Sequence, residues 1–124
     1  MESTNQPRLY RNTVAAIVDA LISTFRLGNY ADQVIPKLLK SNKKWGSRDR
    51  RFIAEHSYNL VRYWRYYSTI AGIDDPNTDN DFWNIFGVYW IASGYTLPPW
   101  SEFESLNSVA VLEESKKDWP IDIK

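Results

Sequence analysis

Apolar residues recur at intervals of three and four along most of the chain, which is the spacing of one face of an α-helix. The first such stretch begins at Pro7 or Arg8 and ends at Gly28, a residue type that commonly terminates helices. We therefore predict a first helix in this stretch. Its apolar face consists of Tyr10, Val14, Ile17, Val18, Leu21, Ile22 and Phe25.

The next stretch, residues 29–40, has the same spacing and predicts a second, shorter helix. Its apolar positions are Val34, Ile35, Leu38 and Leu39. Pro36 lies among them and restricts where this helix can begin. If Asp32 is the N-cap, Pro36 falls in the first turn at little cost, whereas a helix that begins at Tyr30 should kink at the proline.

The longest periodic stretch spans residues 47–71 and predicts a third helix that Gly72 ends. Ser47 is the expected N-cap, and Asp49 falls in the first turn, where negative charge suits the helix dipole. The apolar face consists of Phe52, Ile53, His56, Leu60, Trp64 and Tyr67. Ser47, Asp49 and Phe52 are thus expected to build the start of this helix, and Arg50 suits either that structural motif or a ligand contact.

The C-terminal part predicts a helix over residues 82–93, capped by Asp79–Asp81, and a last helix over residues 107–117. Residues 82–93 are apolar nearly all round, as expected for a helix buried between others. Residues 97–100, Leu-Pro-Pro-Trp, form an extended connector, and residues 101–104 suit a short helical turn. Because no stretch shows a convincing strand pattern, we predict an all-α bundle of about five to six helices.

The 124 residues, 44% hydrophobic and 24% charged, have the composition of a single globular domain. We expect a flexible leader over residues 1–7, a helical domain over 8–117 and a tail over 118–124. The chain has no cysteine, which excludes disulfides, thiolate metal sites and cysteine nucleophiles. No apolar run approaches the roughly 20 residues of a membrane span, and the leader is polar, so we expect a cytoplasmic protein without a membrane partner.

Positive and negative residues are segregated along the chain, although the net charge is zero. Residues 1–72 hold 12 Lys and Arg against 5 Asp and Glu, a formal charge of +7. Residues 73–124 hold 3 against 10, a formal charge of −7. Such asymmetry favours a polyanionic partner for the first half. Charges that pair between the halves, or that are simply solvated, are the alternative explanation.

Candidate catalytic residues are sparse. The one histidine, His56, lies on the apolar face of the third helix, where a histidine is more often a hydrogen-bonded core residue than a general acid or base. The acidic residues between positions 74 and 81 lack the spacing and the closing Glu of a calcium loop, and they suit helix capping. The glycines are isolated and form no phosphate-binding loop. We therefore expect no catalytic residue, metal site or cofactor site in this chain.

The remaining signal is a combination of cations and aromatic residues around the third helix. Arg8 and Arg11 lie at the predicted start of the first helix, where the dipole disfavours positive charge, so we expect another role for them. The candidate phosphate contacts of a nucleic acid are Arg8, Arg11, Lys43, Lys44, Arg48, Arg51, Arg62 and Arg65. Tyr63, Tyr66 and Tyr67 are candidate stacking surfaces, although tyrosines at helical spacing more often belong to the core.

Several segments resemble a known family. Residues 45–55, Trp-Gly-Ser-Arg-Asp-Arg-Arg-Phe-Ile-Ala-Glu, and residues 60–63, Leu-Val-Arg-Tyr, are similar to the N-terminal domain of the RsmB (Fmu/Sun) RNA 5-methylcytosine methyltransferases. Residues 94–103, Gly-Tyr-Thr-Leu-Pro-Pro-Trp-Ser-Glu-Phe, resemble the Gly-x-x-Leu-Pro-x-Trp-x-x-Phe segment of Bacteroidetes-type members, and Tyr-Ala-Asp at 30–32 matches as well. The resemblance covers roughly residues 8–105.

The resemblance implies a NusB-like helical domain that binds and positions an RNA substrate, expected to be ribosomal RNA, without being catalytic itself. In the family, a catalytic domain that uses S-adenosylmethionine follows. This chain stops before such a domain and lacks the cysteines that the family uses for catalysis, so we expect a piece of a longer enzyme, with RNA and that catalytic domain as partners. The alternative is a stand-alone NusB-like protein-interaction or antitermination module, which an exposed apolar surface around Trp100 and Phe103 would favour.

Overall fold

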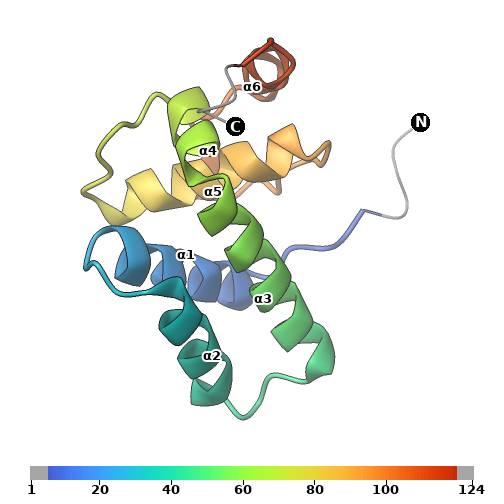
Figure 1. The fold of residues 1–124 in the computed structure, drawn as a ribbon. Helices are drawn as coiled ribbons and strands as arrows, with labels where there is room; N and C mark the ends of the chain where they lie inside the picture. The colour runs from blue at the N-terminus through green and yellow to red at the C-terminus, as the bar shows by residue number, and fades with distance from the viewer. Residues whose placement is uncertain (1–5, 120–124) are drawn as a thin grey trace.

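The computed structural model describes residues 6–119, and the predicted all-α architecture is confirmed (Figure 1). Within these residues the chain forms six α-helices and one short 3-10 helix, with no strand. Residues 1–5 of the predicted leader and 120–124 of the predicted tail lie outside the described part. The elements are α1 (Arg11–Phe25), α2 (Ala31–Ser41), α3 (Ser47–Arg62), α4 (Trp64–Ala71), α5 (Asp79–Ala92), η1 (Ser101–Phe103) and α6 (Ser108–Ser115).

Helix α5 is the centre of the core. Its side chains are buried almost without interruption from Phe82 to Ile91, and Phe82, Phe86 and Trp90 are fully buried. Helices α1, α4, α6 and η1 all pack against it (Figure 1). The sequence predicts this position because an apolar residue at nearly every place on a helix requires neighbours on all sides. Burying each large apolar side chain contributes about 1.5–3 kcal/mol to folding.

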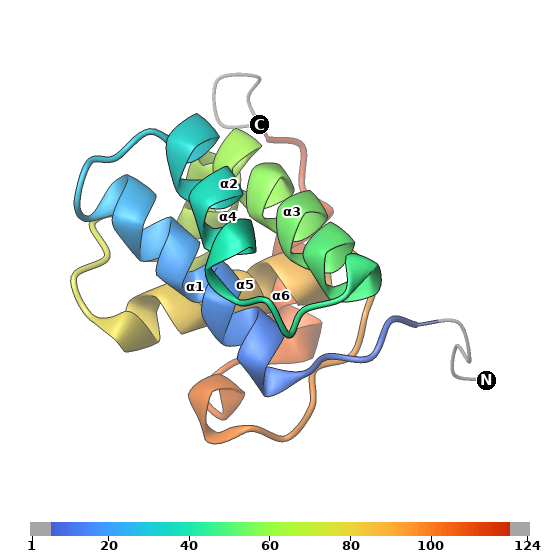
Figure 2. The ribbon, with the colours of Figure 1, turned by 90° about the horizontal axis from the view of Figure 1, so that it is seen from below.

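Helices α1, α2 and α3 pack against one another on one side of α5, so α3 is held by two helices of the N-terminal half (Figures 1 and 2). Val14, Ile17 and Leu21 of α1 are fully buried in this contact region, as the apolar spacing predicts. The exposed side of α3 therefore keeps a fixed orientation relative to the segment that precedes α1. That orientation positions the candidate site described below.

The predicted single helix over residues 47–71 is wrong, because the backbone leaves the helical conformation at Tyr63 (φ −115°, ψ 30°). Helix α3 packs against α1 and α2, whereas α4 packs against α5 and α6. In α4 the ring of Trp64 stacks on Phe25 and Phe82, with ring centroids 4.1 and 5.8 Å apart. The break at Tyr63 allows α3 and α4 to pack against different helices. The apolar spacing alone does not reveal this break.

Two predicted caps are also wrong. Gly46, not Ser47, is the N-cap of α3, and Ser47 is the first helical residue, without a side-chain cap bond. Helix α5 begins at Asp79 rather than Phe82, and its N-cap is Thr78. The Thr78 hydroxyl accepts from the Asp81 amide at 3.1 Å, and the Asp81 carboxylate accepts from the Thr78 amide, which forms a capping box.

The other helix starts and ends differ in detail from the predicted ones. Helix α1 begins at Arg11 with Tyr10 as its N-cap, so Arg8 precedes the helix instead of lying in its first turn. Of the two starts that the sequence leaves open for α2, the structure has the earlier one, with Tyr30 as the N-cap and Pro36 inside the helix. Helix α6 covers Ser108–Ser115 instead of 107–117, and the side chain of Asn107 caps it by accepting from the Ala110 amide at 3.0 Å. None of the helices within residues 6–119 is long and apolar enough to cross a membrane.

Candidate functional site: a basic cavity at the start of α3

The loop between α2 and α3 presents Lys43 and Lys44 to solvent. The Asn42 side chain accepts from the Lys44 amide at 2.9 Å, and the Trp45 amide donates to the Asn42 carbonyl at 3.3 Å. Trp45 itself is buried in the core and anchors the loop. Because Trp45 directs its indole inward, the two lysines before it are left on the surface.

Arg50 fastens this loop to the bundle. Its Nε donates to the Trp45 carbonyl at 3.1 Å, and a terminal guanidinium nitrogen donates to the Leu39 carbonyl at 2.8 Å. Leu39 lies in the last turn of α2, where carbonyls lack helical partners. Of the two roles that the sequence leaves open for Arg50, the geometry therefore favours the structural one. Arg48 and Arg51, on either side of it, are exposed.

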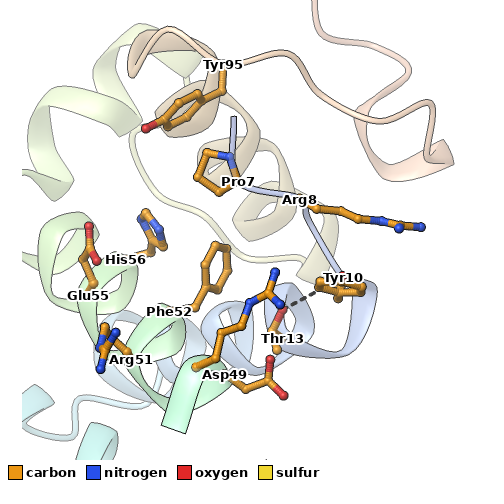
Figure 3. A pocket seen from close by; sticks show the side chains of 11 residues that line it. Pro7, Arg8, Tyr10, Thr13, Asp49, Arg51, Phe52, Glu55, His56 and Tyr95 are labelled. Atoms are coloured by element: carbon orange, nitrogen blue, oxygen red, sulfur yellow. Dashed lines mark hydrogen bonds between the residues drawn. The ribbon is translucent and has the colours of Figure 1, made fainter. Parts of the chain in front are cut away.

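Arg8, Arg48 and Arg51 line one cavity of about 230 Å³ (Figure 3). Three segments contribute to it: residues 7–13 around the start of α1, residues 48–56 of α3, and Tyr95 after α5. The three arginines are exposed, and we call them the rim of the cavity. We call Arg8, Lys43, Lys44, Arg48 and Arg51 the α3 cluster. The other lining residues are Pro7, Tyr10, Thr13, Asp49, Phe52, Glu55, His56 and Tyr95.

Aromatic rings form the deeper wall of the cavity. Phe52 and His56 meet edge to face, with ring centroids 4.4 Å apart, and Tyr95 packs on the buried Trp90 at 4.5 Å. At the rim, the Arg8 guanidinium lies over the Tyr10 ring, 5.3 Å from its centroid. Figure 3 shows Phe52 between His56 and the start of α1. The cavity thus joins aromatic surface to positive charge.

His56 is only 7% exposed, and its Nδ1 lies 2.5 Å from the Tyr89 hydroxyl, which confirms a hydrogen-bonded core histidine. Burial lowers the pKa of His56 below its usual value, and the nearby Glu55 opposes this effect. Burial also raises the pKa of Tyr89 to about 12, so its hydroxyl keeps its proton at neutral pH. The Asn59 amide donates to the same hydroxyl at 3.4 Å, which leaves the Tyr89 proton to be donated to His56.

Asp49 lies on the cavity wall in the first turn of α3, as predicted. Within residues 6–119 the Asp49 carboxylate makes no ion pair, although Arg48 and Arg51 line the same cavity. The Asp49 carboxylate therefore lines the cavity without an ion-pair partner among these residues.

The eight predicted phosphate contacts are all exposed, but they lie in separate places. Arg11 makes a two-pronged ion pair with Glu102 and lies over the rings of Trp83 and Trp100, at 5.3 and 5.7 Å. Arg62 lies about 20 Å from Arg48 along the rise of α3, and Arg65 lies in α4, beyond the break. The α3 cluster holds the remaining five.

Two of the three candidate stacking tyrosines belong to the packed interior. The Tyr66 hydroxyl donates to the Ser115 carbonyl at 2.9 Å. Tyr67 packs edge to face on Tyr89 at 5.1 Å, and burial raises its pKa to about 12. Tyr63, which is 37% exposed with the Arg62 guanidinium 5.5 Å from its ring centroid, keeps an accessible face.

The segment around Trp100 is mainly architectural. Phe103 is 4% exposed and stacks on the half-buried Trp100, with ring centroids 5.7 Å apart. This burial disfavours the exposed apolar surface that a protein-interaction module predicts there. Among residues 6–119, no group of three or more His, Asp and Glu is placed to hold a metal ion. Asp81, one of the acidic residues between positions 74 and 81, forms the capping box with Thr78, which agrees with the predicted capping role of this stretch.

Sequence reasoning misses the aromatic members of the cavity. Tyr10 and Tyr95 belong to segments far from α3 in the chain, and no spacing rule connects them to it. Comparison of the chain with protein-family models, curated proteins and solved structures finds no match. The resemblance to the RsmB-type N-terminal domain therefore stays a prediction. The charge, exposure and surroundings of the cavity residues indicate what the cavity can bind.

Proposed function

We propose that this chain is a non-catalytic RNA-binding domain that positions ribosomal RNA for an S-adenosylmethionine-dependent 5-methylcytosine methyltransferase. The observation that carries the proposal is the α3 cluster, in which five exposed cations from two segments lie around one cavity and its adjoining loop. Phosphates are recognised by such clusters because each contact releases counterions from the nucleic acid. Arginine adds planar, two-pronged hydrogen bonding to phosphate oxygens.

The methyltransferase part of the proposal rests on the sequence segments that resemble RsmB-type proteins. Residues 6–119 form only helices, with no parallel sheet to supply the cofactor-binding turn that such enzymes would need. In this proposal the cofactor and the methyl transfer belong to a separate catalytic domain, and the helical domain supplies affinity and orientation.

Binding of a fluorescent ribosomal RNA fragment across a salt series tests the proposal. We expect binding at low salt, and the slope of log affinity against log salt should fall by about 0.7–0.9 for each phosphate that a variant no longer neutralises. Lys43→Ala/Lys44→Ala should therefore reduce the slope by up to about two.

Lys116→Ala/Lys117→Ala is the matched control. It removes the same charge from two exposed lysines at the end of α6, outside the α3 cluster. This control should leave the slope unchanged. Absence of RNA binding at low salt, or equal slopes for the two double variants, would rule out the proposed role of the cluster.

A further inference from the structure

The cavity at the start of α3 contains more than a phosphate contact requires. A surface that only follows the RNA backbone needs exposed cations, but this one also encloses Phe52, His56 and Tyr95. It further contains two carboxylates, Asp49 and Glu55. Carboxylates repel phosphate, so their presence calls for a ligand with a second kind of group.

We propose that this cavity takes one unpaired nucleotide of an RNA strand, whose phosphate contacts the arginine rim and whose base enters between the aromatic residues. This inference rests on the proposed RNA-binding function and names the part of the RNA that the cavity recognises. The size agrees with a small unit, because about 230 Å³ lies below the range of roughly 300–1,000 Å³ typical of pockets for drug-sized ligands.

The rim suits the phosphate. Arg8, Arg48 and Arg51 are all exposed, and within residues 6–119 none of them is in an ion pair. Arg11 differs, because Glu102 already holds its guanidinium. The three rim arginines can thus contact a phosphate without first breaking an ion pair, whereas Arg11 cannot.

The wall suits a base. Unpaired bases are recognised by stacking on aromatic side chains and by hydrogen bonds to their edges. Phe52 is half-buried and held from behind by Trp90, 6.1 Å away between ring centroids, so its position is fixed before a ligand arrives. A base inside a duplex is stacked between its neighbours and cannot enter such a cavity, which favours single-stranded RNA.

The carboxylates select among bases. Glu55 lies one turn after Arg51 on α3, on the same side of the helix, and both line the cavity (Figure 3). A carboxylate accepts hydrogen bonds from the exocyclic amino group of cytosine or adenine, and uracil has no such group. We therefore expect the cavity to prefer an amino-bearing base over uracil, with Glu55 as the discriminating residue.

Binding of oligo(C), oligo(U) of equal length, a blunt RNA duplex and cytidine monophosphate to the full chain at low salt tests the inference. Oligo(C) should bind about fivefold or more tightly than oligo(U), in line with one base-edge contact. It should also bind more tightly than the duplex, whose bases cannot enter the cavity, and than the free mononucleotide, which cannot engage Lys43 and Lys44 as well.

The variants separate the two parts of the cavity. Arg48→Gln/Arg51→Gln should weaken both oligonucleotides about tenfold or more, because two phosphate-binding charges are removed. Glu55→Ala leaves no side-chain acceptor for the amino group, so it should remove the preference for oligo(C) and leave oligo(U) binding within about twofold. All three positions are exposed, and circular dichroism confirms that each variant is folded.

Each contrary result has a distinct meaning. If RNA binds but the duplex is preferred, or the Arg48/Arg51 variant binds oligo(C) normally, the cavity inference is overturned while the proposed function stands. If cytidine monophosphate binds as tightly as oligo(C), the ligand is a free nucleotide and the inference of an RNA strand fails. If no RNA binds at low salt, the proposed function fails together with the inference.

Discussion

At the scale of single residues, His56 makes the stability of the domain dependent on pH. Burial holds its pKa below the value of about 6.5 that it has in the unfolded chain, so the folded state favours the neutral ring. The stabilisation is fully present above about pH 6.5 and is lost as pH falls toward the lowered folded-state value, at a rate of up to about 1.4 kcal/mol per pH unit.

Urea unfolding between pH 7.5 and 5.5 checks this expectation. The free energy of unfolding should fall over this range in the wild type, and His56→Gln should show a smaller decrease. Most carboxylates titrate below this range, so they contribute less to the comparison. An equal decrease in the two proteins would contradict the assigned role of His56.

Arg50 and Arg51 are neighbours with opposite expected behaviour. Arg50→Ala should destabilise the domain by about 1–3 kcal/mol, because the carbonyls of Leu39 and Trp45 lose a charged donor. Arg51→Ala should change stability by less than about 0.5 kcal/mol, because its exposed side chain belongs to the cavity rim. Chemical denaturation of both variants measures the difference in the free energy of unfolding. Equal decreases in the two variants would contradict a structural role for Arg50 that Arg51 does not share.

At the scale of elements, the two helix starts that the sequence misassigns give a direct comparison. Thr78→Ala removes the side-chain half of the α5 capping box and should cost about 0.5–2 kcal/mol. Ser47→Ala should have an effect within about 0.5 kcal/mol, because Gly46 is the N-cap of α3. Thermal unfolding distinguishes them, and a larger loss for Ser47→Ala would show that the predicted cap is the correct one.

The helices themselves are predictable because their apolar spacing is local information. The same spacing misses the break at Tyr63, since residues 60–67 keep a helical pattern while α3 and α4 pack on different partners. Cap positions are missed for a related reason, since Thr78 and Asp79 are both good N-cap residues. The reciprocal hydrogen bonds between Thr78 and Asp81 make Thr78 the cap.

At the scale of the whole molecule, the sequence predicts the kind of site but not its place. Charge counting identifies a basic half, and all eight candidate cations are indeed exposed. It cannot show that Glu102 neutralises Arg11, because this ion pair joins residues that lie far apart in the chain. The cavity is likewise invisible in the sequence, because Arg8, Phe52 and Tyr95 meet only after the helices pack.

Amide NMR of the labelled chain titrated with a ribosomal RNA fragment at low salt tests the central claim most directly. We predict that the shifts which change most are those of Arg8, residues 43–51 and Tyr95, with little change at Lys116 and Lys117. Changes that cluster instead on α6, or the absence of any change at low salt, would contradict RNA binding through the start of α3.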